Sequence, residues 1–176
     1  MQAELDGTFD FCESCSQHNN CCVRMRHGKG QVASPPLLPH EAGLIASVSK
    51  IEISEFAEDT TPPGNGLAIR ANGDRCYFYR DGKCAIYSAR PLDCRIFPFD
   101  IREVDGGLFW IVYTDLCPTS FDFRRHFASA KHVLAKSNVS RADLIAFTKH
   151  GHVVMAPHSF RLLEEVVVPR EASTQA

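Results

Sequence analysis

The chain of 176 residues is 44% hydrophobic and has a formal net charge of -2 at pH 7. This length predicts one domain, and the apolar content is sufficient for a hydrophobic core. A pI near 6.4 gives no broad basic field of the kind that binds nucleic acid or anionic membranes, so we expect neither as a partner.

The start of the chain and its cysteine content predict where the protein works. The first ten residues contain no basic region followed by an apolar run, and no later segment has about 18 uninterrupted apolar residues. We therefore expect a soluble, cytoplasmic protein. Because thiols stay reduced in the cytosol, the eight cysteines indicate metal binding or catalysis in preference to a disulfide framework.

The first cysteines lie in residues 12–26, a stretch rich in Cys, Asn, Ser and Arg without a clear period. This composition predicts a loop or a short irregular helix wrapped around a ligand. Cys12 and Cys15 have the spacing at which a tight turn directs both sulfur atoms toward one metal ion. Successive side chains diverge in strands and in helices, so the adjacent Cys21 and Cys22 are expected to serve different sites.

The next segments predict a helix, a loop and a short strand. Residues 35–42 form an extended, proline-rich lead into a helix that runs to about Ser49. Residues 60–66 contain two prolines and two glycines and predict a loop, which is followed by a strand at residues 67–70. The expected apolar side of the helix consists of Leu38, Leu44, Ile45 and Val48.

A first β-hairpin is predicted in the middle of the chain. Residues 76–79 and 84–87 flank Arg80-Asp-Gly-Lys83, in which Asp-Gly favours the positive φ angles of a tight turn. We expect this hairpin to bring Cys76 and Cys84 to corresponding positions on one unit.

A second β-hairpin is predicted directly afterwards. Residues 99–104 should pair with residues 108–114 across Asp105-Gly-Gly107. This hairpin ends just before the last cysteine of the chain, Cys117.

Two helices and a last short element are predicted in the remaining chain, and the helices are expected to cover the small sheet. Thr119 or Ser120 should cap the first helix, and a second helix from about residue 140 to 149 should end at Gly151. A last helix or strand is predicted at residues 161–168. The apolar positions of the first helix are Phe123, Phe127, Ala130, Val133 and Leu134.

Together these elements predict an α+β fold class. We expect a small single domain over residues 1–176, with two β-hairpins, a cysteine-rich metal-binding N-terminal loop and C-terminal helices. Within it, residues 9–118 should form the cysteine-cluster core and residues 119–168 a helical extension. Residues 169–176 should be a flexible tail.

The cysteines can supply two complete four-thiolate sites, or one such site with spare thiols. Four thiolates are what a tetrahedral zinc ion or an iron–sulfur cluster needs. The candidate metal ligands are Cys12, Cys15, Cys21, Cys22, Cys76, Cys84, Cys94 and Cys117. Such a site carries negative charge that nearby arginines can screen. The arginines close in sequence to the cysteines are Arg24, Arg26, Arg90 and Arg95, and Arg95 directly follows Cys94 in an apolar context.

Other candidate ligands and catalytic groups have simpler interpretations. His18 is typical of a solvent-exposed loop histidine, although it could replace a thiolate. His150 and His152 would share a face only in an extended segment, and the glycine between them indicates a helix end. Aromatic residues in a hairpin usually serve packing, which is the interpretation for Tyr77, Tyr79 and Tyr87.

The cysteines and their neighbours resemble a known family. The chain contains, in order, Cys12-x-x-Cys15, Cys21-Cys22-x-Arg24, Cys76-x7-Cys84-x-x-Tyr87, Arg90-Pro91-x-x-Cys94-Arg95-x-Phe97-Pro98-Phe99 and Cys117. Over residues 9–118 this pattern is similar to the YkgJ-type cysteine-cluster proteins, which are described as zinc- or iron-chelating domains and often as iron–sulfur proteins. The family's first block is usually tighter and often has a glycine before the paired cysteines, whereas Ser16–Asn20 intervenes here.

The resemblance implies a metal site and leaves three functions open. The first is an iron–sulfur cluster with a redox role. The second is an enzyme related to the flagellin lysine N-methylases, although no glycine-rich nucleotide loop is present. The third is a structural zinc module that binds a protein partner. The residues themselves do not distinguish iron from zinc, because both accept four sulfur ligands.

Overall fold

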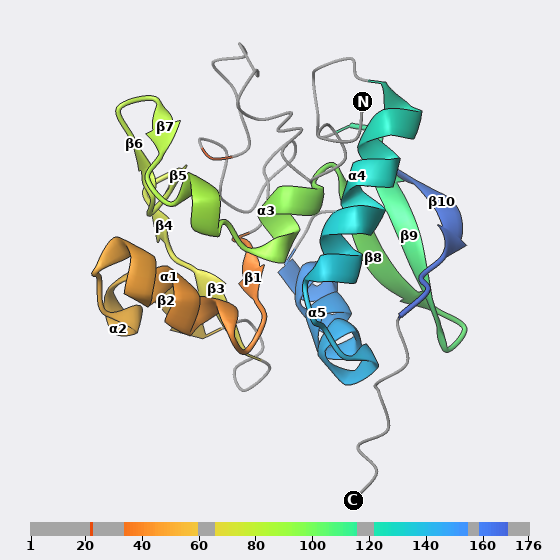
Figure 1. Cartoon of the computed structure of the whole chain (residues 1–176), viewed down its shortest axis with the longest axis horizontal. Helices are drawn as coiled ribbons and strands as arrows, with labels where there is room; N and C mark the ends of the chain where they lie inside the picture. Colours follow the sequence, from red (N-terminus) through yellow and green to blue (C-terminus); the bar gives the residue numbers. More distant parts are fainter. Residues whose placement is uncertain (1–21, 23–33, 60–65, 116–121, 155–158, 169–176) are drawn as a thin grey trace, which may run out of the picture.

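The structure is a computed structural model that describes residue 22 and residues 34–59, 66–115, 122–154 and 159–168. The fold is α+β with β-hairpins and C-terminal helices, as the sequence predicts. Figure 1 shows two groups of elements, with the short helix α3 (Leu92–Ile96) between them. The predicted N-terminal loop and the predicted flexible tail lie outside the described residues, apart from Cys22.

The first group contains a small antiparallel sheet and two helices. Strand β3 (Leu67–Ile69) lies between β1 (Pro36–Leu37) and β2 (Ala57–Asp59). Helices α1 (Glu41–Ser49) and α2 (Ile53–Phe56) connect β1 to β2. The predicted strand and the predicted first helix are confirmed, whereas β1, β2 and α2 are too short to produce a recognisable period in the sequence.

Two small hairpins complete the first group. Strand β4 (Ala71–Asn72) pairs with β5 (Arg75–Cys76), and β6 (Tyr79–Arg80) pairs with β7 (Lys83–Cys84). The β6–β7 turn uses the predicted Asp-Gly pair, whose φ angles are 49° and 79°. These positive angles match the twist of a two-residue hairpin turn.

The first hairpin is shorter than predicted, and the expectation that it would bring Cys76 and Cys84 to corresponding positions is wrong. Cys84 pairs with Tyr79, whereas Cys76 pairs with Ala71 on the preceding hairpin. Beyond Cys84 the chain leaves the strand and forms a 3-10 helix at Tyr87–Ala89. The two cysteines therefore do not occupy corresponding positions of one hairpin, because two short ladders replace one long ladder.

The second group is an antiparallel sheet covered by two helices. Strand β9 (Gly107–Tyr113) lies between β8 (Phe99–Val104) and β10 (Phe160–Glu165). The β8–β9 hairpin is confirmed, with φ angles of 50° and 80° at its Asp-Gly turn, and the last predicted element is a strand. Helix α4 (Phe123–Lys136) lies in front of this sheet in Figure 1, and α5 (Arg141–Val154) lies below α4.

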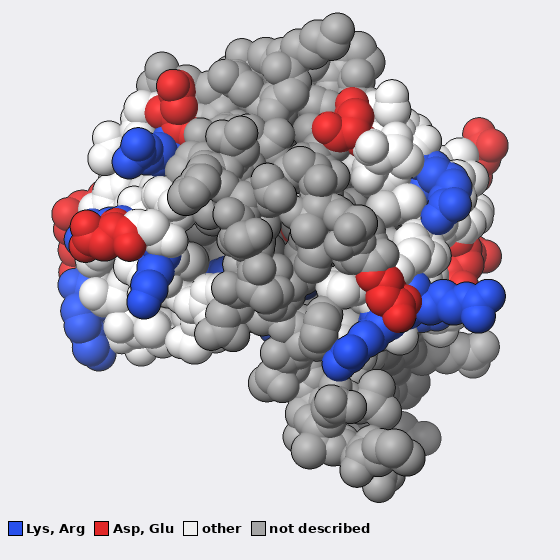
Figure 2. Space-filling view, turned by 90° about the horizontal axis from the view of Figure 1, so that it is seen from above, with Lys and Arg blue, Asp and Glu red and all other residues white. Residues whose placement is uncertain are grey.

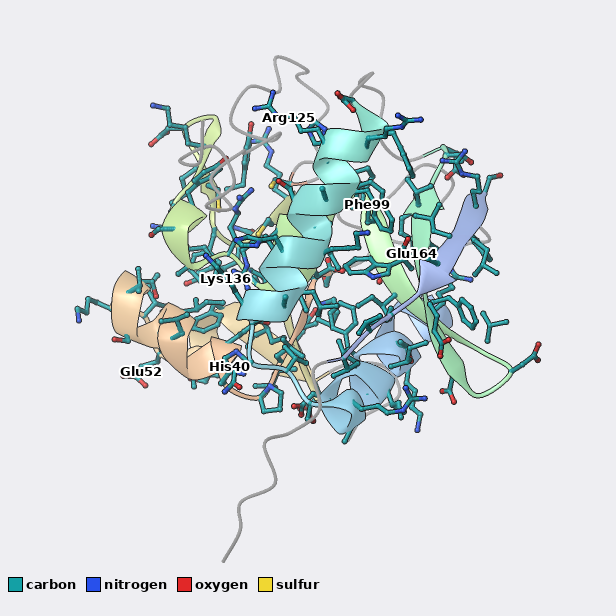
Figure 3. The ribbon with its side chains drawn as sticks, turned by 45° about the vertical axis from the view of Figure 1, so that its right-hand side comes forward. His40, Glu52, Phe99, Arg125, Lys136 and Glu164 are labelled. Atoms are coloured by element: carbon teal, nitrogen blue, oxygen red, sulfur yellow. The ribbon has the colours of Figure 1, made fainter. Side chains whose placement is uncertain are left out.

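The larger core lies between the sheet and α4. The ring of Phe127 lies 5.1 Å from that of Phe99 and meets Trp110 edge-on at 5.7 Å between centroids. Figure 3 shows Phe99 beside α4, whose two ends are marked by Arg125 and Lys136. The other buried members are Leu38, Leu92, Ile96, Ile101, Leu108, Val112, Ala130, Leu134, Leu144, Phe147 and Val166. The predicted covering of the sheet by helices is therefore confirmed.

A second core lies beneath α1 and contains the aromatic rings of Phe56 and Phe78, 5.1 Å apart. Its remaining buried members are Leu37, Ala42, Ile45, Ala57, Ile69, Cys76, Ile86 and Ala89. Because Cys76 belongs to this core, the packing of the first group bears directly on a predicted metal ligand.

The expected apolar side of α1 is partly wrong. Leu44 and Val48 are 52% and 49% exposed, whereas Ile45 is fully buried. The inward face of α1 consists instead of Glu41, Ala42 and Ile45, which lie at positions that share one side of a helix. A buried carboxylate thus replaces a large apolar side chain on the core-facing side.

Two helix ends also differ from the sequence predictions. The carboxylate of Asp122, in place of Thr119 or Ser120, caps α4 by accepting a hydrogen bond from the backbone N–H of Arg125 at 3.1 Å. Helix α5 continues through Gly151 to Val154. A glycine inside a helix costs about 1 kcal/mol relative to alanine, which is not enough to end the helix.

The length of the helices and the distribution of surface charge can be compared with those of a membrane-spanning or strongly charged protein. None of the helices in the described parts of the chain is long and apolar enough to cross a membrane. On the face drawn in Figure 2, basic and acidic side chains lie near one another around the described surface.

We predict that Phe127→Ala lowers the free energy of unfolding by about 3–5 kcal/mol, because it removes a ring that contacts both sheet and helix aromatics. Urea denaturation of the reduced, metal-free protein measures this change. The matched control is Leu44→Ala, since Leu44 is half exposed and its truncation should cost at most about 0.5 kcal/mol. Equal losses in the two variants would contradict the assignment of the core.

Candidate metal centre

The four described cysteines come from four separate segments. Cys22 stands alone before the first group, Cys76 ends β5, Cys84 ends β7 and Cys94 lies in α3. None of these four described cysteines is part of a disulfide. Cys76 is buried in the second core, and Cys22 and Cys84 pack against the same core while remaining half-buried.

These thiols are close enough to influence one another's ionisation. Burial is the largest cause that raises the pKa of Cys94 well above its ordinary value. The charges of Cys76 and Cys22 raise the pKa of Cys94 further. The charge of Cys84 likewise raises the pKa of Cys76. The structure therefore gathers four thiols that are distant in sequence into one neighbourhood.

Backbone amides hold the sulfur of Cys76. Burial raises the pKa of Cys76 to about 11, while hydrogen bonds from the N–H groups of Phe78 and Tyr79 lower it. Amides two and three residues after a cysteine that point at its sulfur stabilise a thiolate once a metal is bound. This turn is fixed by Phe78, which is buried in the second core and whose carbonyl accepts a hydrogen bond from the N–H of Ala85 at 2.8 Å.

Helix α3 presents Cys94 from between the two cores. Pro91 precedes the helix and provides no side-chain cap, but Glu41 of α1 accepts a hydrogen bond from the N–H of Leu92 at 2.6 Å. The other carboxylate oxygen of Glu41 accepts from the N–H of Leu38 at 2.9 Å. Desolvation raises the pKa of Glu41, whereas these hydrogen bonds and then the charge of Arg95 lower it. No motif in the sequence distinguishes this glutamate from an ordinary first-turn residue.

Arg90 lies beside the Cys94 thiol. Its Nε donates a hydrogen bond to the carbonyl oxygen of Tyr87 at 3.2 Å, and its Cζ lies 4.0 Å from the centroid of the Tyr87 ring. The positive charge of Arg90 lowers the pKa of Cys94, in opposition to burial. Arg90 can therefore partly balance thiolate charge at this position.

Arg95 connects α3 to α4. Its guanidinium donates a hydrogen bond to the hydroxyl of Ser137 at 3.1 Å. Desolvation lowers the pKa of Arg95, whereas the charges of Glu41 and Cys94 raise it. Arg95 is exposed, hydrogen-bonds a hydroxyl, and lies near enough to a carboxylate and a predicted ligand for their charges to act on it.

An acidic group that the sequence analysis missed lies next to Cys94. Burial, followed by the charges of Asp100 and Glu41, raises the pKa of Asp93 well above its usual range. Asp100 accepts hydrogen bonds from the hydroxyl of Tyr113 and from the N–H of Ile101, both at 2.7 Å. Asp100 follows the Phe-Pro segment in the sequence, but only the fold brings it near Asp93.

Two tyrosines of the first hairpin are consistent with a packing role, whereas the helix end predicted between the two late histidines is wrong, because α5 continues through both. Tyr77 meets Phe78 edge-on, with 5.2 Å between ring centroids, and packs with Tyr79 against the second core. The backbone at His150 and His152 is helical, so two positions separated by one residue do not share a face.

The donor set fits a thiolate-bound metal, although the described residues alone do not form a closed site. Sulfur donors suit zinc ions and iron–sulfur clusters. No three His, Cys, Asp or Glu side chains within the described ranges already stand in the arrangement of a metal site. The remaining predicted site residues, which lie outside those ranges, are Cys12, Cys15, Cys21, Cys117 and Arg24.

A sequence model of the CxxCxxCC family, described as a "putative zinc- or iron-chelating domain", matches residues 11–118. The chain belongs to the CxxCxxCC family. The match begins just before Cys12 and ends just after Cys117, so it confirms the resemblance carried by the cysteine pattern. Membership of the CxxCxxCC family indicates a metal cofactor, zinc or iron. No curated protein and no solved structure matches the chain.

We predict that metal uptake by this CxxCxxCC domain releases protons and strengthens as pH rises. With a pKa of about 11, the Cys76 thiol is protonated near neutral pH, and a metal must displace that proton. Each displaced proton should raise the apparent affinity about tenfold per pH unit. Zn²⁺ added to the reduced, metal-free protein with a pH indicator should release one proton fewer from Cys76→Ser than from the wild type. Equal proton release would exclude Cys76 as a ligand.

Proposed function

We propose that the protein binds an iron–sulfur cluster through its cysteine thiolates and uses the cluster in a redox role. The proposed ligands are Cys12, Cys15, Cys21, Cys22, Cys76, Cys84, Cys94 and Cys117, and the proposed surrounding cations are Arg24, Arg90 and Arg95. The observation that carries this proposal is the gathering of four sequence-distant thiols beside an arginine that favours the thiolate.

Cluster ligation in preference to zinc ligation is supported by the resemblance to the YkgJ-type proteins, which are often described as iron–sulfur proteins. The eight cysteines suffice for a four-thiolate cluster and leave further thiols over. The amides that point at Cys76 would also be hydrogen-bond donors to cluster sulfur, one of the factors that set the potential of such clusters.

A structural zinc module remains the second candidate, and one observation favours it. The strands that carry Cys76 and Cys84 are each two residues long. Ladders this short contribute few backbone hydrogen bonds, so a metal could supply much of the local stability. The protein would then serve to bind a protein partner.

Two further proposals accompany the function. The four described cysteines are not joined in disulfides, as in a reducing compartment, and this supports a cytoplasmic location. The larger core includes Leu92 and Ile96 together with Phe127 and Leu144, so side chains from the cysteine-bearing region and the helical extension share one interior. This common hydrophobic core supports a single domain over residues 1–176.

The deciding experiment is anaerobic purification followed by an absorption spectrum and quantification of iron, zinc and sulfide. A brown protein with a band near about 400 nm and matched iron and sulfide is the expected result. A colourless protein that holds zinc would replace the cluster proposal with the structural zinc module. A cluster that retains an open iron position would direct attention to an enzyme of the flagellin lysine N-methylase-related type.

We predict that Cys94→Ser and Cys84→Ser each lower the bound metal and the thermal stability together, because loss of a ligand is coupled to folding. Metal analysis and a thermal melt of anaerobically purified protein measure the two effects. Ser88→Ala is the control, since Ser88 is exposed and lies close in sequence to Cys84. Full metal content in both cysteine variants would exclude these two ligands.

We predict that Arg95→Gln leaves the cluster bound and lowers its reduction potential, since removal of a nearby positive charge disfavours the added electron. Protein-film voltammetry measures the shift. Arg141→Gln is the control, because Arg141 is exposed, as Arg95 is, but donates to the carbonyl oxygen of Gly106 in the β8–β9 turn and not to a group near a predicted ligand. An unchanged potential in Arg95→Gln would place the guanidinium outside the influence of the cluster.

A further inference from the structure

Glu41 is an unusual residue in this fold because it is a carboxylate with only 3% of its surface exposed. It lies at the first position of α1, in the group of elements that also carries Cys76 and Cys84. Around it, Leu38 is 2% exposed and Leu92 is fully buried. A buried carboxylate is costly unless hydrogen bonds compensate its lost hydration, so its contacts indicate what it does.

The two hydrogen bonds of Glu41 join segments that are distant in sequence. Oε2 accepts from the N–H of Leu38, three residues earlier, at 2.9 Å. Oε1 accepts from the N–H of Leu92, 51 residues later, at 2.6 Å. Leu92 is the first residue of α3, and the preceding Pro91 has no side-chain group that could satisfy this N–H. Glu41 therefore acts as the missing cap of α3.

Helix α3 carries both a predicted ligand and a predicted cation. Cys94 is two residues beyond the capped N–H and interacts with Cys76 and Cys22. The charges of Glu41 and Cys94 raise the pKa of Arg95, and its guanidinium donates to the hydroxyl of Ser137, the C-cap of α4, at 3.1 Å. The orientation of α3, and with it the direction of the Cys94 sulfur, depends on these anchors at its two ends.

We propose that Glu41 is a positioning residue of the metal centre: it holds the start of α3, and with it Cys94, in place relative to the second core, against which Cys76 and Cys22 pack. This inference rests on the proposed function, since it assigns a role around the same thiols. Glu41 is not one of the proposed ligands. It acts through the backbone of α3, as outer groups do that orient the ligands of a metal.

The test compares Glu41→Gln with the matched control Glu52→Gln in reduced, metal-free protein. The amide of Gln can accept only one of the two N–H donors and carries no charge for Arg95. Glu52 is exposed, its side chain makes no capping hydrogen bond, and it lies at the periphery beside α1 and α2 in Figure 3. Co²⁺ is the probe, because its thiolate charge-transfer and d–d absorption report the number and arrangement of sulfur ligands.

The expected result separates positioning from stability alone. Glu41→Gln should bind Co²⁺ about 10- to 100-fold more weakly than the wild type, with altered d–d absorption, whereas Glu52→Gln should match the wild type. Hydrogen exchange of residues 92–96 in the metal-free protein should be faster only in Glu41→Gln. Faster exchange with unchanged Co²⁺ affinity and absorption would overturn the inference and leave Glu41 with a purely structural role.

The same experiment distinguishes failure of this inference from failure of the proposed function. If the wild type develops no thiolate–Co²⁺ absorption and the anaerobically purified protein holds neither a cluster nor zinc, the metal centre itself is wrong, and the role of Glu41 falls with it. If the wild type and Glu41→Gln bind Co²⁺ alike, only the inference about Glu41 is wrong.

Two further measurements apply if Glu41→Gln does not fold. Glu41→Asp keeps the charge near Arg95 but is one methylene too short to reach both N–H groups. It should weaken Co²⁺ binding, and wild-type affinity would overturn the inference. In the wild type, Co²⁺ should slow hydrogen exchange in residues 38–42 and 92–96 together. Unchanged exchange in both segments would show that this contact is not coupled to the centre.

Discussion

A single buried carboxylate connects the parts of this fold. Glu41 accepts one hydrogen bond from the segment that leads into its own helix and one from the start of α3. Leaving such a charge unpaired in the interior would cost several kcal/mol, so the backbone donors and the carboxylate must meet as the chain folds. The relative position of α1 and α3 is therefore fixed by a polar contact at the junction of two apolar cores.

The elements that carry the cysteines depend on this junction because they are too short to be stable alone. The ladders around Cys76 and Cys84 are two residues long, and α3 has five residues. Elements of this size have little stability alone, and here they are attached to the second core through Phe78 and to the larger core through Leu92 and Ile96. The thiols of a CxxCxxCC domain are thus presented by short segments held on a well-packed frame.

The parts of the fold that the sequence predicts are those with a local physical cause. Asp-Gly pairs specify both hairpin turns through their positive φ angles, and the spacing of Phe127 and its apolar neighbours specifies the inward face of α4. The spacing of cysteines likewise predicts the family. The grouping of thiols is different, since Cys22 and Cys94 meet only through tertiary packing. The role of Glu41 is equally non-local, because its partner Leu92 is 51 residues away.

The scattered origin of the thiols also sets an order of events during synthesis. Cys22 leaves the ribosome long before Cys76 and Cys94, and α3 cannot dock until the residues that surround it have emerged. The helix that covers the larger core, α4, follows later still. The thiol of Cys22 is therefore synthesised before the cysteines with which it is grouped in the fold. During this interval it can react with metal ions and oxidants in solution before Cys76 and Cys94 are available.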